Sequence, residues 1–143
     1  MLTISQPLLD QLTRHVAGTY PNEGGGLLIG CVSANGTKVV EEIKVFDNQH
    51  ALEEQYHRIL ITDRMVQEAE EYADNKGALL IGFFHSHPDH PARPSEFDRD
   101  HALPWWSYVI VSVQQGRAAH VLSWELREDR SRFDEEEIVM REA

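Results

Sequence analysis

Apolar side chains recur along this chain with two spacings, one typical of helices and one typical of strands. Apolar positions at helical spacing predict a helix from Pro7 to Tyr20, with the proline in its first turn. The same spacing predicts a second helix from Thr62 to about Lys76, which Gly77 would end. A short third helix is expected from Glu96 to Leu103, because Ser95 is a good N-terminal cap.

Strands are predicted where apolar residues alternate or run together between turn residues. Gly26 to Ser33 and Thr37 to Phe46 would form a hairpin around Asn35-Gly36, a dipeptide that favours tight turns. Ala78 to His85 is a continuous apolar run, the pattern of a strand buried on both faces. The other predicted strands are Glu54 to Ile59, Tyr108 to Val113 and Ala119 to Leu126, the last two paired with each other.

The tail and the single cysteine complete the predicted fold. The tail from Phe133 is expected to be helical, with the acidic run at residues 134–137 on a solvated face. Cys31 lies in an apolar strand and is expected to be a buried packing group rather than a nucleophile. The order of elements implies an α/β or α+β fold with a central mixed β-sheet flanked by helices. The length of 143 residues fits a single domain over residues 1–143.

Composition limits the partners and the compartment. The chain has 13 Lys and Arg against 24 Asp and Glu, a formal net charge of −11; such a surface repels phosphate backbones, so nucleic acid is not expected as a partner. The longest mostly apolar stretch, Gly77 to Phe84, is far shorter than the roughly twenty residues of a membrane helix. The N-terminal residues lack a secretory signal pattern, and one cysteine permits no internal disulfide. We therefore expect a cytoplasmic protein without a membrane partner.

Histidine, serine and aspartate gather in one stretch, GFFHSHPDHPARPSEFDRD, at residues 82–100. His85 and His87 stand at the end of the predicted buried strand, where residues two apart point to the same face while Ser86 points to the other. Pro88 cannot continue a central strand, so both imidazoles lie at the strand end, a common place for functional sites in α/β proteins. Two neighbouring imidazoles there suit a divalent metal, zinc above all.

A zinc site needs a third protein ligand, and Asp98 is the best candidate. In the first turn of the short helix, its carboxylate would point back toward the strand end. The alternative is structural, because Ser95-x-x-Asp98 is also a capping box. His90 and His101 lie close enough in sequence to compete as ligands. The other histidines are expected at the surface or its boundary: His15, His50, His57 and His120.

A hydrolytic zinc site also needs a general base for its water. Glu23 stands out because it precedes Gly24-Gly25-Gly26 at the mouth of the first core strand. Three glycines there would let another backbone approach closely or an extended peptide lie alongside, and in the second case they are candidate substrate-binding residues. In the alternative they form a plain loop, and Glu23 is a solvated surface residue.

The combined pattern resembles the JAMM motif of the MPN-plus (Mov34/PAD-1) zinc metalloprotease family. That motif is a glutamate, then His-x-His, seven residues, Ser, two residues and Asp; here it reads Glu23, His85-Ser86-His87, residues 88–94, Ser95 and Asp98. The sequence around the motif is also similar to that family, including Gly-Leu-Leu-Ile-Gly after the glutamate and Tyr-Val-Ile-Val after the motif. The chain looks like a compact bacterial-type member, which implies a single MPN/JAMM domain with a cytidine deaminase-like layout.

The resemblance implies a role for each motif residue. His85, His87 and Asp98 would hold Zn2+, with water as the fourth ligand. Glu23 would take a proton from that water and deliver it to the leaving amine, and Ser95 would donate a hydrogen bond to the oxyanion.

The resemblance also implies a substrate class. Family members cleave peptide or isopeptide bonds after the C-terminal Gly-Gly of ubiquitin-like proteins. Compact members are associated with small sulfur carriers of the ThiS/MoaD type, which we take as the expected partner. Many of these members carry Ala-Cys-Gly where this chain has Gly24-Gly25-Gly26, and this departure weakens the substrate analogy.

Other function classes fit the residues less well. A non-catalytic MPN scaffold that binds ubiquitin-like partners is the main alternative, but such members characteristically lose metal ligands or the glutamate. A RadC-like domain shares the His-x-His-x7-Ser-x2-Asp spacing, but no helix-hairpin-helix segment precedes it here. A zinc nucleoside deaminase would need Pro-Cys-x-x-Cys, which a chain with one cysteine lacks. A purely structural zinc site would need a fourth ligand.

Overall fold

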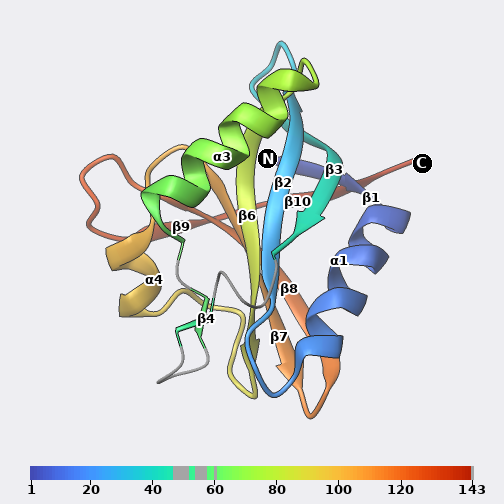
Figure 1. The fold of residues 1–143 in the computed structure, drawn as a ribbon, viewed down its shortest axis with the longest axis vertical. Coiled ribbons are helices and arrows are strands. Elements are labelled where there is room, and N and C mark those ends of the chain that lie inside the picture. The colour runs from blue at the N-terminus through green and yellow to red at the C-terminus, as the bar shows by residue number, and fades with distance from the viewer. Residues whose placement is uncertain (47–51, 54–57, 60, 143) are drawn as a thin grey trace.

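A mixed eight-stranded sheet with helices on both faces forms the protein (Figure 1). The structure is a computed structural model that describes residues 1–46, 52–53, 58–59 and 61–142. The strand order is β10-β1-β3-β2-β6-β7-β8-β9. The strands of this sheet are β1 (Leu2–Ser5), β2 (Gly25–Val32), β3 (Lys38–Val45), β6 (Leu79–Pro88), β7 (Ser107–Gln114), β8 (Arg117–Leu126), β9 (Phe133–Glu136) and β10 (Ile138–Arg141). The expected architecture, a mixed sheet flanked by helices, is confirmed.

Three helices accompany the sheet in the described residues. Helix α1 (Gln6–Thr19) and helix α3 (Asp63–Asn75) form where the apolar spacing predicts them. The hydroxyl of Thr62 accepts a hydrogen bond from the Met65 N–H and so caps α3. The short helix α4 (Glu96–His101) follows β6 and ends two residues earlier than expected.

Two apolar layers hold the helices against the sheet. On one face Leu12 and Val16 of α1 pack with Phe84 of β6. On the other face Ala69 and Ala73 of α3 pack with Phe83, the neighbour of Phe84 in the strand. Successive residues of β6 therefore serve opposite layers, as expected of a central strand buried on both faces.

The predicted helix after Phe133 is wrong. Residues 133–136 form β9 beside β8, and residues 138–141 form β10, parallel to β1 at the other edge of the sheet. The solvated-face prediction holds for the exposed Asp134, Glu135 and Glu137 but fails for Glu136, which is 6% exposed and accepts hydrogen bonds from Ser107 and Ser123. Pairing with distant strands and this buried polar contact override the local preference of an acidic run.

Cys31 is exposed, so its predicted burial is wrong. Strand β2 is paired with β6 only as far as Gly30, which lies opposite Leu79 at the start of β6. Cys31 therefore extends past the end of that neighbour, where an apolar sequence pattern no longer implies burial.

The predicted strand from Glu54 to Ile59 falls mostly on residues 54–57, which lie outside the described residues. Its last two residues form β5 (Arg58–Ile59), paired antiparallel with β4 (Leu52–Glu53). None of the described helices is long and apolar enough to cross a bilayer.

Candidate metal centre

His85 and His87 lie side by side near the end of the central strand. Their Nε2 atoms are 3.2 Å apart, and each residue is 8% exposed. Strand β6 pairs with β7 at both histidines and with β2 as far as His85, so neighbouring strands hold the backbone that carries the two rings. The predicted projection of both imidazoles to one face is confirmed.

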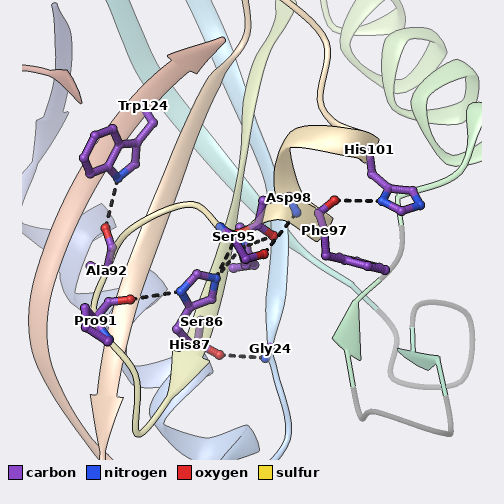
Figure 2. Close-up of polar contacts among 11 residues, drawn as sticks. Gly24, Ser86, His87, Pro91, Ala92, Ser95, Phe97, Asp98, His101 and Trp124 are labelled. Atoms are coloured by element: carbon purple, nitrogen blue, oxygen red, sulfur yellow. Dashed lines mark hydrogen bonds and ion pairs between the residues drawn. The ribbon is translucent and has the colours of Figure 1, made fainter. Parts of the chain in front are cut away.

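Asp98 of α4 completes a three-residue cluster. Its Oδ1 lies 3.2 Å from His85 Nε2, and its Oδ2 lies 3.0 Å from His87 Nε2. The same Oδ2 accepts a hydrogen bond from the Ser95 N–H at 2.8 Å, while the Asp98 N–H donates to Ser95 Oγ at 3.1 Å (Figure 2). The capping box and the metal-ligand arrangement, which the sequence leaves as alternatives, are therefore present together, and the cap aims the carboxylate.

A backbone carbonyl sets the tautomer of His87. The ring Nδ1 lies 3.0 Å from the Pro91 carbonyl oxygen, which can only accept a hydrogen bond (Figure 2). In the neutral ring the Nδ1 therefore carries the proton and the Nε2 lone pair faces the cluster, the arrangement that metal-binding histidines need. Trp124 holds the same loop by donating its indole N–H to the Ala92 carbonyl at 3.0 Å.

The histidines and the carboxylate polarise one another. Burial by itself would lower the pKa of His85, but the charge of Asp98, its hydrogen bond and the charge of Glu23 together raise it above the ordinary value. Burial would raise the pKa of Asp98, yet the charges and hydrogen bonds of His85 and His87 hold it far below its usual range. The Asp98 carboxylate is therefore ionised at neutral pH, the form that binds a metal.

The donor set fits zinc. Two imidazole nitrogens and one carboxylate are ligands that zinc prefers, and three protein ligands leave a fourth position open, as in catalytic sites. Ligands at 2.0–2.1 Å in a tetrahedron lie about 3.3 Å apart, close to the 3.2 Å between the two Nε2 atoms. His85, His87 and Asp98 therefore have the chemistry and the spacing of a zinc site.

Glu23 and Ser95 share a cavity with the cluster. The cavity has a volume of about 440 Å³, and its lining includes Glu23, His87, Ser95 and Asp98. Glu23 is half-buried just before β2, so the structure does not leave it on an open surface loop. Five predicted site residues thus converge, since His85 lies directly beside His87 and Asp98.

Ser86 joins the Glu23 segment to the metal centre, a role that sequence reasoning missed. It points away from the two histidines, and its Oγ accepts a hydrogen bond from the Gly24 N–H at 2.9 Å (Figure 2). The alternation of side chains along β6 signals that Ser86 faces the other layer, but nothing in the sequence identifies Gly24 as its partner.

The three glycines are buried, and their backbone groups bond with neighbouring strands. Gly25 pairs with His85 of β6, and Gly26 pairs with both Phe84 and Val45. A Cβ at Gly26 would lie 2.3 Å from the Lys44 carbonyl oxygen and 2.6 Å from the Phe84 ring. These contacts explain the glycines by close packing; their role in substrate binding stays a prediction, and their burial gives it no support.

Neither competing histidine joins the cluster. The Nδ1 of His101 lies 2.8 Å from the Phe97 carbonyl oxygen, and His90 lines the cavity without belonging to the cluster. His120 is exposed, as expected, and His15 is half-buried on α1 against Phe84. His50 and His57 lie outside the described residues.

The sequence profile of the Prok-JAB family, described as prokaryotic homologs of the JAB domain, matches residues 5–127. A comparison with proteins of curated function found no match.

Several solved structures have the same fold. A Salinibacter ruber protein is 39% identical, with a TM-score of 0.76 over 99% of this chain and 92% of that chain. A Desulfitobacterium hafniense protein is 29% identical, with a TM-score of 0.82 over 100% of this chain and 94% of that chain. A third structure, described as a JAMM metalloprotease-like zinc site in the proteasome and signalosome, is 19% identical, with a TM-score of 0.56 over 99% of both chains. At that identity the third likeness shows the fold alone.

Proposed function

The chain belongs to the family of prokaryotic JAB-domain homologues, and from that premise we propose that it is a zinc-dependent peptidase or isopeptidase. Its proposed substrate is a ubiquitin-like protein or a ThiS/MoaD-type sulfur carrier, cut after the C-terminal Gly-Gly. We propose a cytoplasmic location and no nucleic-acid partner, in keeping with the acidic composition.

One observation carries this proposal. The side chains of His85, His87 and Asp98 converge beside a cavity that Glu23 and Ser95 also line. A scaffold domain has no need of a third ligand aimed by a capping box, or of a carboxylate held next to the ligands. The arrangement instead resembles a catalytic zinc site with an open position.

The proposed mechanism gives each of these side chains one task. Bound zinc would supply the Lewis acid that activates a water molecule and polarises the scissile carbonyl. Glu23 would take the proton of the attacking water and pass it to the leaving amine. The Ser95 hydroxyl oxygen accepts a hydrogen bond from the Asp98 N–H, which leaves its own O–H free to donate. That O–H would donate a hydrogen bond to the developing oxyanion.

The test is cleavage of a carrier protein extended beyond its Gly-Gly. Zinc-loaded wild type, Glu23→Gln and Asp98→Ala would each be incubated with the fusion, with product masses and zinc content measured. We expect wild type to remove the extension, Glu23→Gln to keep zinc but lose about 10²–10⁴-fold in rate, and Asp98→Ala to lose zinc.

Two results would contradict the proposal in different ways. A wild type that binds no zinc would overturn the metal centre. A wild type that binds zinc and the carrier but cuts neither peptide nor isopeptide fusions would make the domain a non-catalytic scaffold.

A further inference from the structure

Three arginines meet in a second pocket that adjoins the metal centre. Arg93, Arg99 and Arg132 line a depression of about 290 Å³ between the loop into α4, α4 itself and the start of β9. Arg93 and Ser95 belong to the lining of this arginine pocket and to that of the catalytic cavity. A polypeptide bound at the metal centre can therefore extend directly into the arginine pocket.

The charges of these arginines are poorly neutralised. Arg99 donates to the neutral Ser131 carbonyl at 3.3 Å. Arg132 lies 3.6 Å from a carboxylate oxygen of Asp134, but Arg127 binds the other oxygen of that carboxylate at 2.9 Å. Among the described residues, Arg93 has no carboxylate within ion-pair distance.

The pocket has the opposite charge to most of the chain. Its described lining contains three arginines and a single acidic residue, Glu96, in a protein with a formal net charge of −11. A locally positive site on a negative surface concentrates anionic groups at that point. Guanidinium groups also match the planar geometry of carboxylates and bind them with two parallel hydrogen bonds.

From this charge and position we propose that the arginine pocket binds acidic side chains of the polypeptide substrate within a few residues of the scissile bond. The inference rests on the proposed peptidase function and adds a preference to it: substrates with aspartate or glutamate next to the cleavage site. Trp124 and Phe133, which also line the pocket, would contact the apolar parts of the same segment.

The test compares carrier fusions that differ only in charge near Gly-Gly. In the first pair, one fusion has two serines directly after Gly-Gly and the other has two aspartates there. In the second pair, the two serines or two aspartates stand directly before Gly-Gly. The enzymes are wild type, Arg93→Gln, Arg93→Gln with Arg132→Gln, and Arg14→Gln. Arg14 is an exposed residue of α1. Helix α1 packs on one face of the sheet, and Ala102, which follows α4, packs on the other. Arg14→Gln therefore controls for the change in net charge.

We expect wild type and Arg14→Gln to favour the aspartate member of at least one pair by about three- to tenfold in kcat/KM. The difference should lie in KM, and its size is that expected of one or two partly exposed ion pairs. The preference should shrink in Arg93→Gln, vanish in the double variant and fall with added salt. Equal cleavage of both members by wild type, or an undiminished preference in the double variant, overturns the inference.

Binding separates this inference from the proposed function. Fluorescent peptides with the same sequences would be titrated into the Glu23→Gln variant, with and without Arg93→Gln. Tighter binding of the acidic peptide that depends on Arg93 supports the pocket even if no fusion is ever cut. Cleavage of all fusions without any charge preference leaves the function standing and overturns the pocket.

Discussion

Ser86 and Gly24 exchange two hydrogen bonds: the Gly24 N–H donates to Ser86 Oγ at 2.9 Å, and the Ser86 N–H donates to the Gly24 carbonyl at 3.0 Å. Gly24 follows Glu23, and Ser86 lies between His85 and His87. This contact therefore fixes the backbone of the proposed base relative to the strand that carries two proposed zinc ligands.

Replacing Ser86 by alanine should lower both stability and turnover. The buried Gly24 N–H would lose its acceptor, at a cost of about 1–3 kcal/mol in unfolding free energy. We expect kcat for a carrier fusion to fall while zinc content stays unchanged, because no zinc ligand is altered. The matched control is Ser123→Ala, because Ser123 is a buried serine of β8 that donates a hydrogen bond to Glu136. This variant should lower stability without a selective loss of kcat. Full kcat in Ser86→Ala would show that the contact does not position Glu23.

Gly24→Ala should strain the junction between α1 and β2. The added Cβ would lie 2.4 Å from Thr19 Oγ1 and 3.0 Å from Thr19 Cγ2. Overpacking of this kind costs about 1–3 kcal/mol, measurable by urea unfolding. Thr19→Ala removes both atoms, so the double variant should recover part of the loss. A double variant no more stable than Gly24→Ala would mean that the strain lies elsewhere.

Zinc affinity should begin to fall, as the pH is lowered, at a pH above the pKa of an ordinary histidine. Asp98 and Glu23 raise the pKa of His85 against the effect of burial, and zinc binds only the neutral ring. Affinity should therefore be full above this raised pKa and decline as the pH falls through it. Competition titrations with a chelator between pH 5 and 8, read beside NMR titration of the metal-free histidines, provide the measurement.

The stability of the metal-free protein should change in the opposite sense. A raised pKa of His85 in the folded state adds stability that is complete below the unfolded pKa of 6.5 and is lost as the pH rises through the folded pKa. Urea unfolding at several pH values, with Asp98→Asn as the control that removes the anion, should show this loss in the wild type and little of it in the variant. A wild type whose stability does not fall across this range would contradict the assignment.

Lys38→Met should destabilise the protein far from the metal centre. Lys38 is 4% exposed and lies 3.1 Å from both Ser107 Oγ and Glu125 Oε2. Its loss leaves Glu125 close to Glu136 without the cation. Because the Glu125 side chain is 40% exposed, solvent screens part of this repulsion, and the cost should lie below the about 3–5 kcal/mol of a fully buried pair. Burial, and then the charge of Glu136, raise the pKa of Glu125, so the deficit should shrink as the pH falls and Glu125 is protonated.

Zinc content and urea unfolding of Lys38→Met check this prediction. The control is Lys44→Met on the same strand, where the side chain is exposed and stacks over the Tyr72 ring. Zinc content should stay unchanged in both variants. A loss in Lys38→Met no greater than that in Lys44→Met would mean that the buried lysine contributes little.

The sequence predicts the elements whose signals are local. The apolar spacing of α1 and the Asn35-Gly36 turn between β2 and β3 each lie within one segment, and both are confirmed. The metal cluster is predictable because His85 and His87 share a strand face and Ser95 caps the helix that carries Asp98.

The missed features depend on distant partners. β1, β9 and β10 are short strands at or near the sheet edges, and their conformation is set by the strands beside them. The exposure of Cys31 depends on where the neighbouring strand β6 begins. The hydrogen bonds of Ser86 and the pairing of Gly26 likewise join segments far apart in the sequence, so no local pattern reveals them.

The parallel pairing of β1 with β10 has a consequence for the order of folding. It joins residues 2–5 to residues 138–141, and contacts so distant in sequence form slowly because a long loop must close first. Until residues 138–141 leave the ribosome, β1 has one edge without its native neighbour, and open strand edges pair readily with other chains. Molecules in which residues 138–141 have not yet paired with β1 should therefore be the most prone to aggregation.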